Sequence, residues 1–239
     1  MLSIALRSLA RATRPLYQFI YPPLCLVCDV STTQRTGGVC EECWRDIMTV
    51  TPENALLHQA RQRLCSEGSC HGVIADFVFE EDGTLQQIIH LLKYGGMTSI
   101  GVALGRRLGN RLKAELLPTA IDGILPIPLH RTKERERGYN QAGFIAEGIS
   151  SSTGFPVRNS LLRRRRFTVT QTRLTAEERR LNVADAFEVP LSSRSSVHEK
   201  RFLLVDDVIT TGATTEAAAW ALVSAGALAP VVCAVALAK

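Results

Sequence analysis

The sequence lacks any long apolar run. A membrane-spanning helix needs about 20 consecutive apolar residues, and the strongest apolar stretch, residues 217–238, is interrupted by Ser224, Gly226 and Pro230. Internal repeats and low-complexity linkers are also missing, which excludes solenoids and long flexible connections. Aromatic residues make up only 6% of the chain, so few rings are available to stack on nucleic-acid bases. We therefore expect no membrane span.

The composition is that of a folded chain with a sizeable core. The 239 residues suffice for one large domain or for one domain and a small module, and 46% of them are apolar. The net charge of +5 is moderate, but residues 158–180 contain eight arginines against two glutamates. Such a cluster indicates an anionic partner, either phosphate or nucleic acid. The alternative is a solvated loop face.

The first 24 residues are basic and have no acid. Leucine and isoleucine recur in them at helical spacing, and Arg7, Arg11 and Arg14 supply the charge. An amphipathic start without acids is also typical of transit peptides. We favour a short helix that packs on the next module, because Tyr21-Pro22-Pro23 leads directly into cysteines without a small-residue cleavage signal.

Cysteine usage predicts a local metal site. Seven cysteines fit poorly with a closed disulfide set, and six of them lie between residues 25 and 70, which points to a reducing compartment. Two C-x2-C pairs, Cys25/Cys28 and Cys40/Cys43, have the spacing of a tetrahedral structural Zn²⁺ centre. The alternative is four reduced thiols. A weak second site from Cys65, Cys70, His71 and His58 is a further alternative, as are remnants in a loop.

Apolar patterning predicts strands and helices, which alternate from about residue 85 onward. Strands are expected at 73–80, 121–129, 186–189, 201–205 and 230–237, and helices at 84–93, 99–117, 139–151 and 214–224. Thr84 and Ser99 are the expected N-caps. This alternation predicts an α/β domain with a mainly parallel sheet and helices on both faces. We divide the chain into a zinc-ribbon-like module with its basic helix at 1–70 and the α/β domain at 71–239.

The segment FLLVDDVITTGATTEAAAW, residues 202–220, predicts a phosphate-binding loop. An apolar strand is followed by Asp206 and Asp207, at the sheet edge where ligands of open α/β folds bind. The loop that opens the next helix comprises Thr210, Thr211, Gly212, Ala213 and Thr214. A helix N-terminus offers N–H donors to a phosphate, and glycine lets the backbone approach. The carboxylates suit sugar hydroxyls and a Mg²⁺ ion held by a diphosphate. The alternative is an acidic turn before a threonine-capped helix.

Four separated blocks resemble the ComF/GntX family of competence-associated proteins. They are LLKYGG (91–96), ILPIPLHRTKERERGYNQA (124–142), RRRRFTVTQTRLTAEERRLNVADAF (163–187) and the segment from Leu204 to Thr214, which resembles the phosphoribosyl diphosphate (PRPP) motif of type I phosphoribosyltransferases. The order of the blocks and the preceding cysteine module also match. Many family members have four C-x2-C pairs, whereas this chain has two.

The resemblance implies a zinc ribbon followed by a type I phosphoribosyltransferase-like domain. It implies that Asp206 and Asp207 face the ribose hydroxyls and that residues 210–214 bind the 5′-phosphate. The diphosphate side and flexible loop of the site are implied to contain Arg137, Gly138, Asn140, Gln141, Gln171 and Arg180. Mg²⁺ with PRPP, structural Zn²⁺, a cytoplasmic location and a link to DNA uptake are implied in the same way.

Two functions remain open from the sequence. One is transfer of a phosphoribosyl group from PRPP to an acceptor, for which no general base stands out. The other is a non-catalytic protein that senses PRPP or another phosphate ligand, while the zinc module and arginines bind single-stranded DNA or a protein partner.

Overall fold

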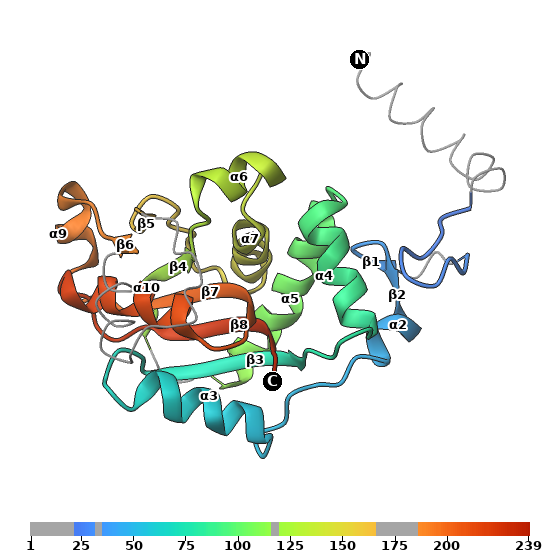
Figure 1. Cartoon of the computed structure of the whole chain (residues 1–239), viewed down its shortest axis with the longest axis horizontal. Helices are drawn as coiled ribbons and strands as arrows, with labels where there is room; N and C mark the ends of the chain where they lie inside the picture. The colour runs from blue at the N-terminus through green and yellow to red at the C-terminus, as the bar shows by residue number, and fades with distance from the viewer. Residues whose placement is uncertain (1–21, 32–34, 116–119, 166–185) are drawn as a thin grey trace, which may run out of the picture.

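The computed structural model describes residues 22–31, 35–115, 120–165 and 186–239 (Figure 1). The strands are β1 (Arg35–Thr36), β2 (Val39–Cys40), β3 (Gly72–Val78), β4 (Gly123–Pro126), β5 (Arg163–Arg164), β6 (Phe187–Glu188), β7 (Phe202–Ile209) and β8 (Val231–Leu237). The helices are α2 (Glu41–Arg45), α3 (Ala55–Cys65), α4 (Thr84–Tyr94), α5 (Thr98–Glu115), α6 (Arg131–Arg137), α7 (Gln141–Thr153), η1 (Leu191–Ser193), α9 (Arg194–Val197) and α10 (Ala213–Ser224).

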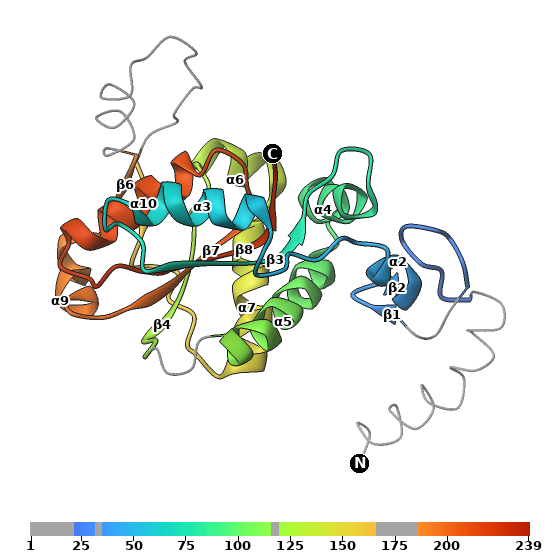
Figure 2. The same cartoon turned by 90° about the horizontal axis from the view of Figure 1, so that it is seen from below.

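The centre of the fold is a parallel sheet of four strands in the order β3-β8-β7-β4. All of its pairings are parallel, and β8 is buried along its whole length, as a strand covered on both faces should be. Helices α5 and α7 cover one face, and α3 and α10 cover the other (Figure 2). Helix α4 belongs to the same buried cluster as α5 and α7. The predicted α/β class with helices on both faces is confirmed.

Helices α5 and α7 cross in close backbone contact. The contact depends on glycines: a Cβ added at Gly105 would lie 2.0 Å from the carbonyl oxygen of Ile145, and one at Gly148 would lie 2.2 Å from that of Val102. Glycine in a helix costs about 1 kcal/mol relative to alanine. The close packing of the two helices on the sheet offsets this cost.

We expect Gly105→Ala to destabilise the protein by about 3 kcal/mol, near the upper end of the range for overpacked cores. The added methyl group would collide with backbone of α7, which cannot rotate away as a side chain can. Urea denaturation of both proteins measures the difference. Gly143→Ala is the matched control, because nothing lies within 4 Å of its added Cβ. That control should leave stability unchanged or raise it, and a similar loss in both variants would contradict the packing argument.

The cysteine-bearing segment shares its core with the sheet domain. Cys25, Cys43 and Trp44 belong to the same buried cluster as Phe77 of β3 and Ile100 of α5. The guanidinium carbon of Arg107 lies 5.1 Å from the Trp44 ring centroid. Trp44, one of the few rings that the sequence offers for base stacking, is therefore buried and faces the domain.

Several local predictions were wrong. Gly83 rather than Thr84 is the N-cap of α4, and the Thr84 hydroxyl donates to Asp46 at 2.7 Å. Ser99 lies inside α5, which begins at Thr98. Helices α3 and α6 were not predicted. Helix α3 precedes residue 70 in the sequence but packs on the sheet, so the boundary between 1–70 and 71–239 stays a prediction. Most of the predicted basic N-terminal helix lies outside the described residues.

Candidate functional site

Strand β7 continues past the point where the sequence predicted its end. The apolar run stops at Val205, but β7 remains paired with β8 as far as Ile209 and Leu237. On the other side, β4 pairs only up to Pro126 and Val205, and the last bond between the two strands is the one that the Ile127 N–H donates to the Val205 carbonyl at 2.8 Å. Asp206 and Asp207 therefore lie within β7, beyond the end of β4, where the strand has a neighbour on one side only.

The two carboxyl groups interact with each other, and their pKa values shift in opposite directions. Asp206 accepts a hydrogen bond from the backbone N–H of Asp207 at 2.8 Å. Burial, together with the adjacent charge of Asp207, raises the pKa of Asp206 well above its ordinary value. Burial opposes ionisation of Asp207 as well, but the Lys93 ammonium outweighs it and lowers the pKa of Asp207. Asp207 therefore ionises more readily than Asp206.

The predicted loop leads from β7 into α10. Gly212 is the N-cap of this helix, with φ +74° and without a side-chain capping bond, so Ala213 and Thr214 form its first turn. The Thr210 and Thr211 side chains are exposed, whereas Gly212 is buried. The sequence therefore predicted correctly that a Thr-Thr-Gly loop opens a helix.

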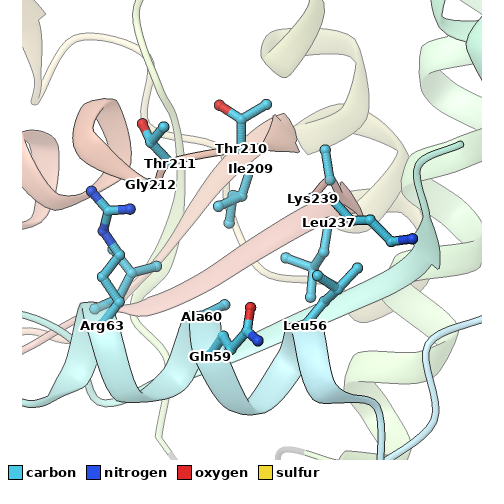
Figure 3. Close-up of a pocket in the computed structure, with 12 residues that line it drawn as sticks. Leu56, Gln59, Ala60, Arg63, Ile209, Thr210, Thr211, Gly212, Leu237 and Lys239 are labelled. Atoms are coloured by element: carbon cyan, nitrogen blue, oxygen red, sulfur yellow. The ribbon is translucent and has the colours of Figure 1, made fainter. Parts of the chain in front are cut away.

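Helix α3 packs against this loop. A cavity of about 240 Å³ lies between α3, the loop and the end of β8, and Arg63, Leu64, Thr210, Thr211 and Gly212 are among its lining residues. In Figure 3, Ile209 points toward α3, while the side chains of Thr210 and Thr211 point away from it. A Cβ added at Gly212 would lie 3.1 Å from Leu64. The loop is therefore positioned by a helix that the sequence analysis missed.

The block RGYNQ forms the elbow between α6 and α7. Gly138 ends α6 with φ +80°, and Asn140 caps α7 while its amide donates to the Ile127 carbonyl at 2.9 Å. The buried Gln141 accepts a hydrogen bond from Arg137 at 2.8 Å. In this elbow Gly138, Asn140 and Gln141 set local geometry and fix the position of Arg137. Their predicted contact with a diphosphate stays a prediction.

The end of α4 joins this elbow to the acidic pair. The Lys93 ammonium forms an ion pair with Asp207, and the guanidinium of Arg137 lies over the Tyr94 ring at 5.3 Å. The Tyr139 hydroxyl donates to the Leu92 carbonyl. Three of the four sequence blocks therefore meet at one place. Sequence reasoning did not assign Lys93 to the site, although its block LLKYGG was recognised.

The fourth block contributes Arg164 on β5. Burial lowers the pKa of Arg164, and the charge of Asp206 opposes this shift. Arg164 also lies over Phe187, 5.3 Å from its ring centroid. A cavity of about 670 Å³ beside β4 is lined by Arg163, Arg164 and Arg165 among others. Gln171 and Arg180 lie outside the described residues.

The four cysteines of the C-x2-C pairs converge on one point. Their sulfur atoms all lie within 4.8 Å of one another, with 3.9 Å between Cys25 and Cys43 and 3.8 Å between Cys28 and Cys40. Zn–S bonds of about 2.3 Å place the sulfurs of a tetrahedral centre about 3.8 Å apart, so the set fits zinc.

Backbone donors favour a thiolate at Cys25, whereas the pKa values of Cys28 and Cys43 are raised, chiefly at Cys43 by burial. Burial opposes ionisation of Cys25, but backbone N–H groups of Cys28, Cys40 and Val27 donate to its sulfur and lower its pKa to about 6. A metal would take the remaining thiols as thiolates. Among the described residues this is the one group of three or more His, Cys, Asp or Glu side chains placed to hold a metal. Cys65, Cys70 and His71 are thus not assembled with His58 into a second centre.

Comparison with known proteins agrees with this arrangement. Residues 16–55 match the double zinc ribbon domain family. The chain is 29% identical to DNA utilization protein YhgH of Escherichia coli O157:H7 over 224 residues, which cover 86% of this chain and 93% of that protein. It is 24% identical to competence protein ComFC of Bacillus subtilis strain 168, over 89% and 93% of the two chains. Competence protein F of Haemophilus influenzae is 39% identical over 93 residues, 39% of this chain and 40% of that protein.

The four-cysteine cluster and the parallel α/β sheet with its acidic Thr-Thr-Gly loop agree with a zinc-ribbon module followed by an α/β domain. The chain is similar to the YhgH and ComFC proteins over 86% and 89% of its length, respectively. The solved structure of glutamine PRPP amidotransferase from B. subtilis matches at a TM-score of 0.37 and 23% identity, over 55% of this chain and 26% of that one. None of the helices in the described part of the chain is long and apolar enough to cross a membrane.

Proposed function

We propose that this protein binds a phosphorylated sugar diphosphate of the PRPP type, with Mg²⁺, and transfers its phosphoribosyl group to an acceptor. The observation that carries the proposal is the placement of the acidic pair directly before a Thr-Thr-Gly loop at a helix N-terminus. Backbone N–H groups of residues 211–214 would hold the 5-phosphate, because a helix N-terminus favours anions. Asp206 and Asp207 would accept hydrogen bonds from the sugar hydroxyls.

The cations around the acidic pair support the same ligand. Lys93 of α4 pairs with Asp207, Arg137 of α6 packs on Tyr94 beside Lys93 in the sequence, and Arg164 of β5 interacts electrostatically with Asp206. A diphosphate leaving group carries several negative charges, and such cations stabilise the charge that develops as it departs. The described residues gather no third protein ligand around the aspartates, so a Mg²⁺ ion would depend on oxygen atoms of the diphosphate for its remaining ligands.

A second candidate function is binding of single-stranded DNA in connection with competence or DNA utilization. The names of the relatives YhgH and ComFC favour it, as does the basic segment from residue 158 to 180. Of the rings considered for base stacking, Trp44 is buried and Tyr94 is exposed, so charge would supply most of the affinity. Binding of this kind weakens steeply with salt, and fluorescence anisotropy between 50 and 200 mM salt would measure it.

Calorimetry with PRPP and Mg²⁺ tests the first candidate, and Gly212→Ala ties the result to the loop. The substitution puts a side chain on a residue with φ +74° and pushes it toward Leu64, so the loop must shift. We expect the affinity for PRPP to fall about tenfold or more, as loss of one or two charge-assisted hydrogen bonds implies, and stability to fall by about 1 kcal/mol.

Gly154→Ala is the matched control. Gly154 has φ +82° but nothing lies within 4 Å of its added Cβ, so it carries the same backbone strain away from the loop. It should lose similar stability and keep its affinity for PRPP. Wild-type protein that gives no heat with PRPP, or a Gly212→Ala variant that binds as well as Gly154→Ala, would count against the proposal.

A further inference from the structure

Lys93 is the cation in closest contact with the acidic pair. It occupies the last turn of α4, which ends at Tyr94 and is followed by Gly95 and Gly96, the latter with φ +68°. A lysine in the last turn is favoured by the helix dipole. Its ammonium contacts the Asp207 carboxylate, so the side chain crosses from the helix end to the sheet.

The ion pair lies at the rim of the core: both side chains are partly exposed, while the Asp207 Oδ2 that contacts the ammonium is buried. The exposed fractions of the two side chains are 24% for Lys93 and 16% for Asp207. A fully buried pair would lose several kcal/mol if one partner left, whereas a partly exposed lysine can turn its ammonium toward water or a ligand at low cost. The geometry therefore permits an exchange of partners at Asp207.

A second cation, Arg137, packs against the end of α4. Arg137 stacks on Tyr94, the neighbour of Lys93, and a guanidinium nitrogen lies 3.5 Å from the Tyr94 hydroxyl. Its other terminal nitrogen is fixed by Gln141 at 2.8 Å. The end of α4 thus carries Lys93, which is paired with Asp207, and packs through Tyr94 against a second cation, Arg137 of α6.

We propose that Lys93 is a positioning residue that makes the site prefer a sugar phosphate with a diphosphate at carbon 1 over the plain sugar 5-phosphate. In the free protein its ammonium balances the charge of Asp207. When ligand hydroxyls donate to Asp207, the ammonium turns to the diphosphate, next to Arg137. The inference rests on the proposed function, and it adds a selectivity that the loop and the aspartates alone do not give.

The test compares two ligands on the wild type and on Lys93→Met, Lys93→Arg and Lys113→Met, by calorimetry with Mg²⁺ present. We expect Lys93→Met to bind PRPP about 10- to 100-fold more weakly, as loss of a charge-assisted contact implies. Its affinity for ribose 5-phosphate should stay within about threefold of wild type or improve, because that ligand has no diphosphate for the ammonium. Lys93→Arg should recover most of the affinity for PRPP. Lys113, an exposed lysine on α5, provides a control with the same loss of charge.

If Lys93 only holds α4 against the sheet, the expected result is different. Lys93→Met would then weaken both ligands equally or neither, and either outcome overturns the inference while the proposed function stands. Wild-type protein that binds neither ligand overturns the proposed function itself, and this inference with it. The melting temperature of each variant shows whether a loss of binding reflects unfolding.

Discussion

Replacing both Asp206 and Asp207 by asparagine is expected to weaken binding of PRPP at least about 100-fold, while the fold is retained. The pair lies on the part of β7 that extends past β4, so its carboxyl groups do not hold the core of the sheet together. Hydrogen bonds to a charged acceptor contribute about 1.5–3 kcal/mol each. Two acceptors on a sugar diol therefore account for an effect of this size. Calorimetric titration with PRPP and Mg²⁺ measures it.

The two single variants should differ. Because burial raises the pKa of Asp206, the fold disfavours its charge, and Asp206→Asn, which removes that charge and keeps the shape, should leave stability almost unchanged. Asp207→Asn removes the partner of Lys93 and should lower both the melting temperature and the affinity. A double Asp82→Asn, Asp122→Asn variant, which changes two exposed aspartates, controls for the altered net charge. Undiminished binding of PRPP by the Asp206, Asp207 double variant would refute the assigned role of these carboxylates.

Activity is a separate question from binding for this pair. Release of diphosphate from PRPP in the presence of candidate acceptors would show transfer, and the same variants should abolish it. A wild-type protein that binds PRPP tightly and releases no diphosphate with any acceptor would instead favour the sensing alternative. The binding and turnover measurements therefore separate the two readings that the sequence left open.

The parts of the site that local sequence determines were predicted well. The Thr-Thr-Gly sequence before an alanine-rich run indicates a helix start, and α10 begins at Ala213. Each C-x2-C pair forms a short turn whose geometry is determined locally, so the two turns only have to come together to form the metal site. In both cases the chemistry of neighbouring residues decides the structure.

The parts that depend on distant partners could not be predicted. β7 extends to Ile209 because β8 continues beside it, which no residue between 202 and 209 signals. Lys93 is 114 positions from Asp207 in the sequence, and only the fold of α4 against the sheet brings them together. Helix α3 was missed because it lies within the cysteine-bearing segment and has no strong apolar face. Its position is explained by packing on the sheet and against Gly212.

Removal of zinc is expected to have the largest effect on stability. The cysteine cluster packs against the α/β domain. Cys40, Cys43 and Trp44 lie in the same core as Phe77, and a Cβ added at Gly37 would lie 2.7 Å from the Cβ of Ala103 on α5. Without the metal, a buried set of thiolates would have to take up protons or separate. Structural zinc contributes on the order of 10 kcal/mol in small zinc modules, which exceeds the total stability of many domains.

Chelation, or the substitution Cys43→Ser, should therefore release one zinc ion per chain, loosen the module and expose Trp44. The fluorescence of Trp44 reports this directly in a Trp220→Phe background, since the chain has two tryptophans. We expect a red shift of its emission together with a melting temperature lowered by 10 °C or more, on the order expected for a loss of several kcal/mol. Cys65→Ser, which lies outside the four-cysteine cluster, should keep both its zinc and its melting temperature.

The zinc content of purified protein decides how the module is built. One ion per chain, lost in Cys43→Ser and retained in Cys65→Ser, agrees with the single centre formed by Cys25, Cys28, Cys40 and Cys43. Two ions per chain would contradict it and would require a second centre. A metal-free protein with unchanged melting temperature would show that packing around Trp44 suffices without zinc. Because α4 is hydrogen-bonded to this module through Thr84 and Asp46 at one end and carries Lys93 at the other, loss of zinc should also weaken binding of PRPP.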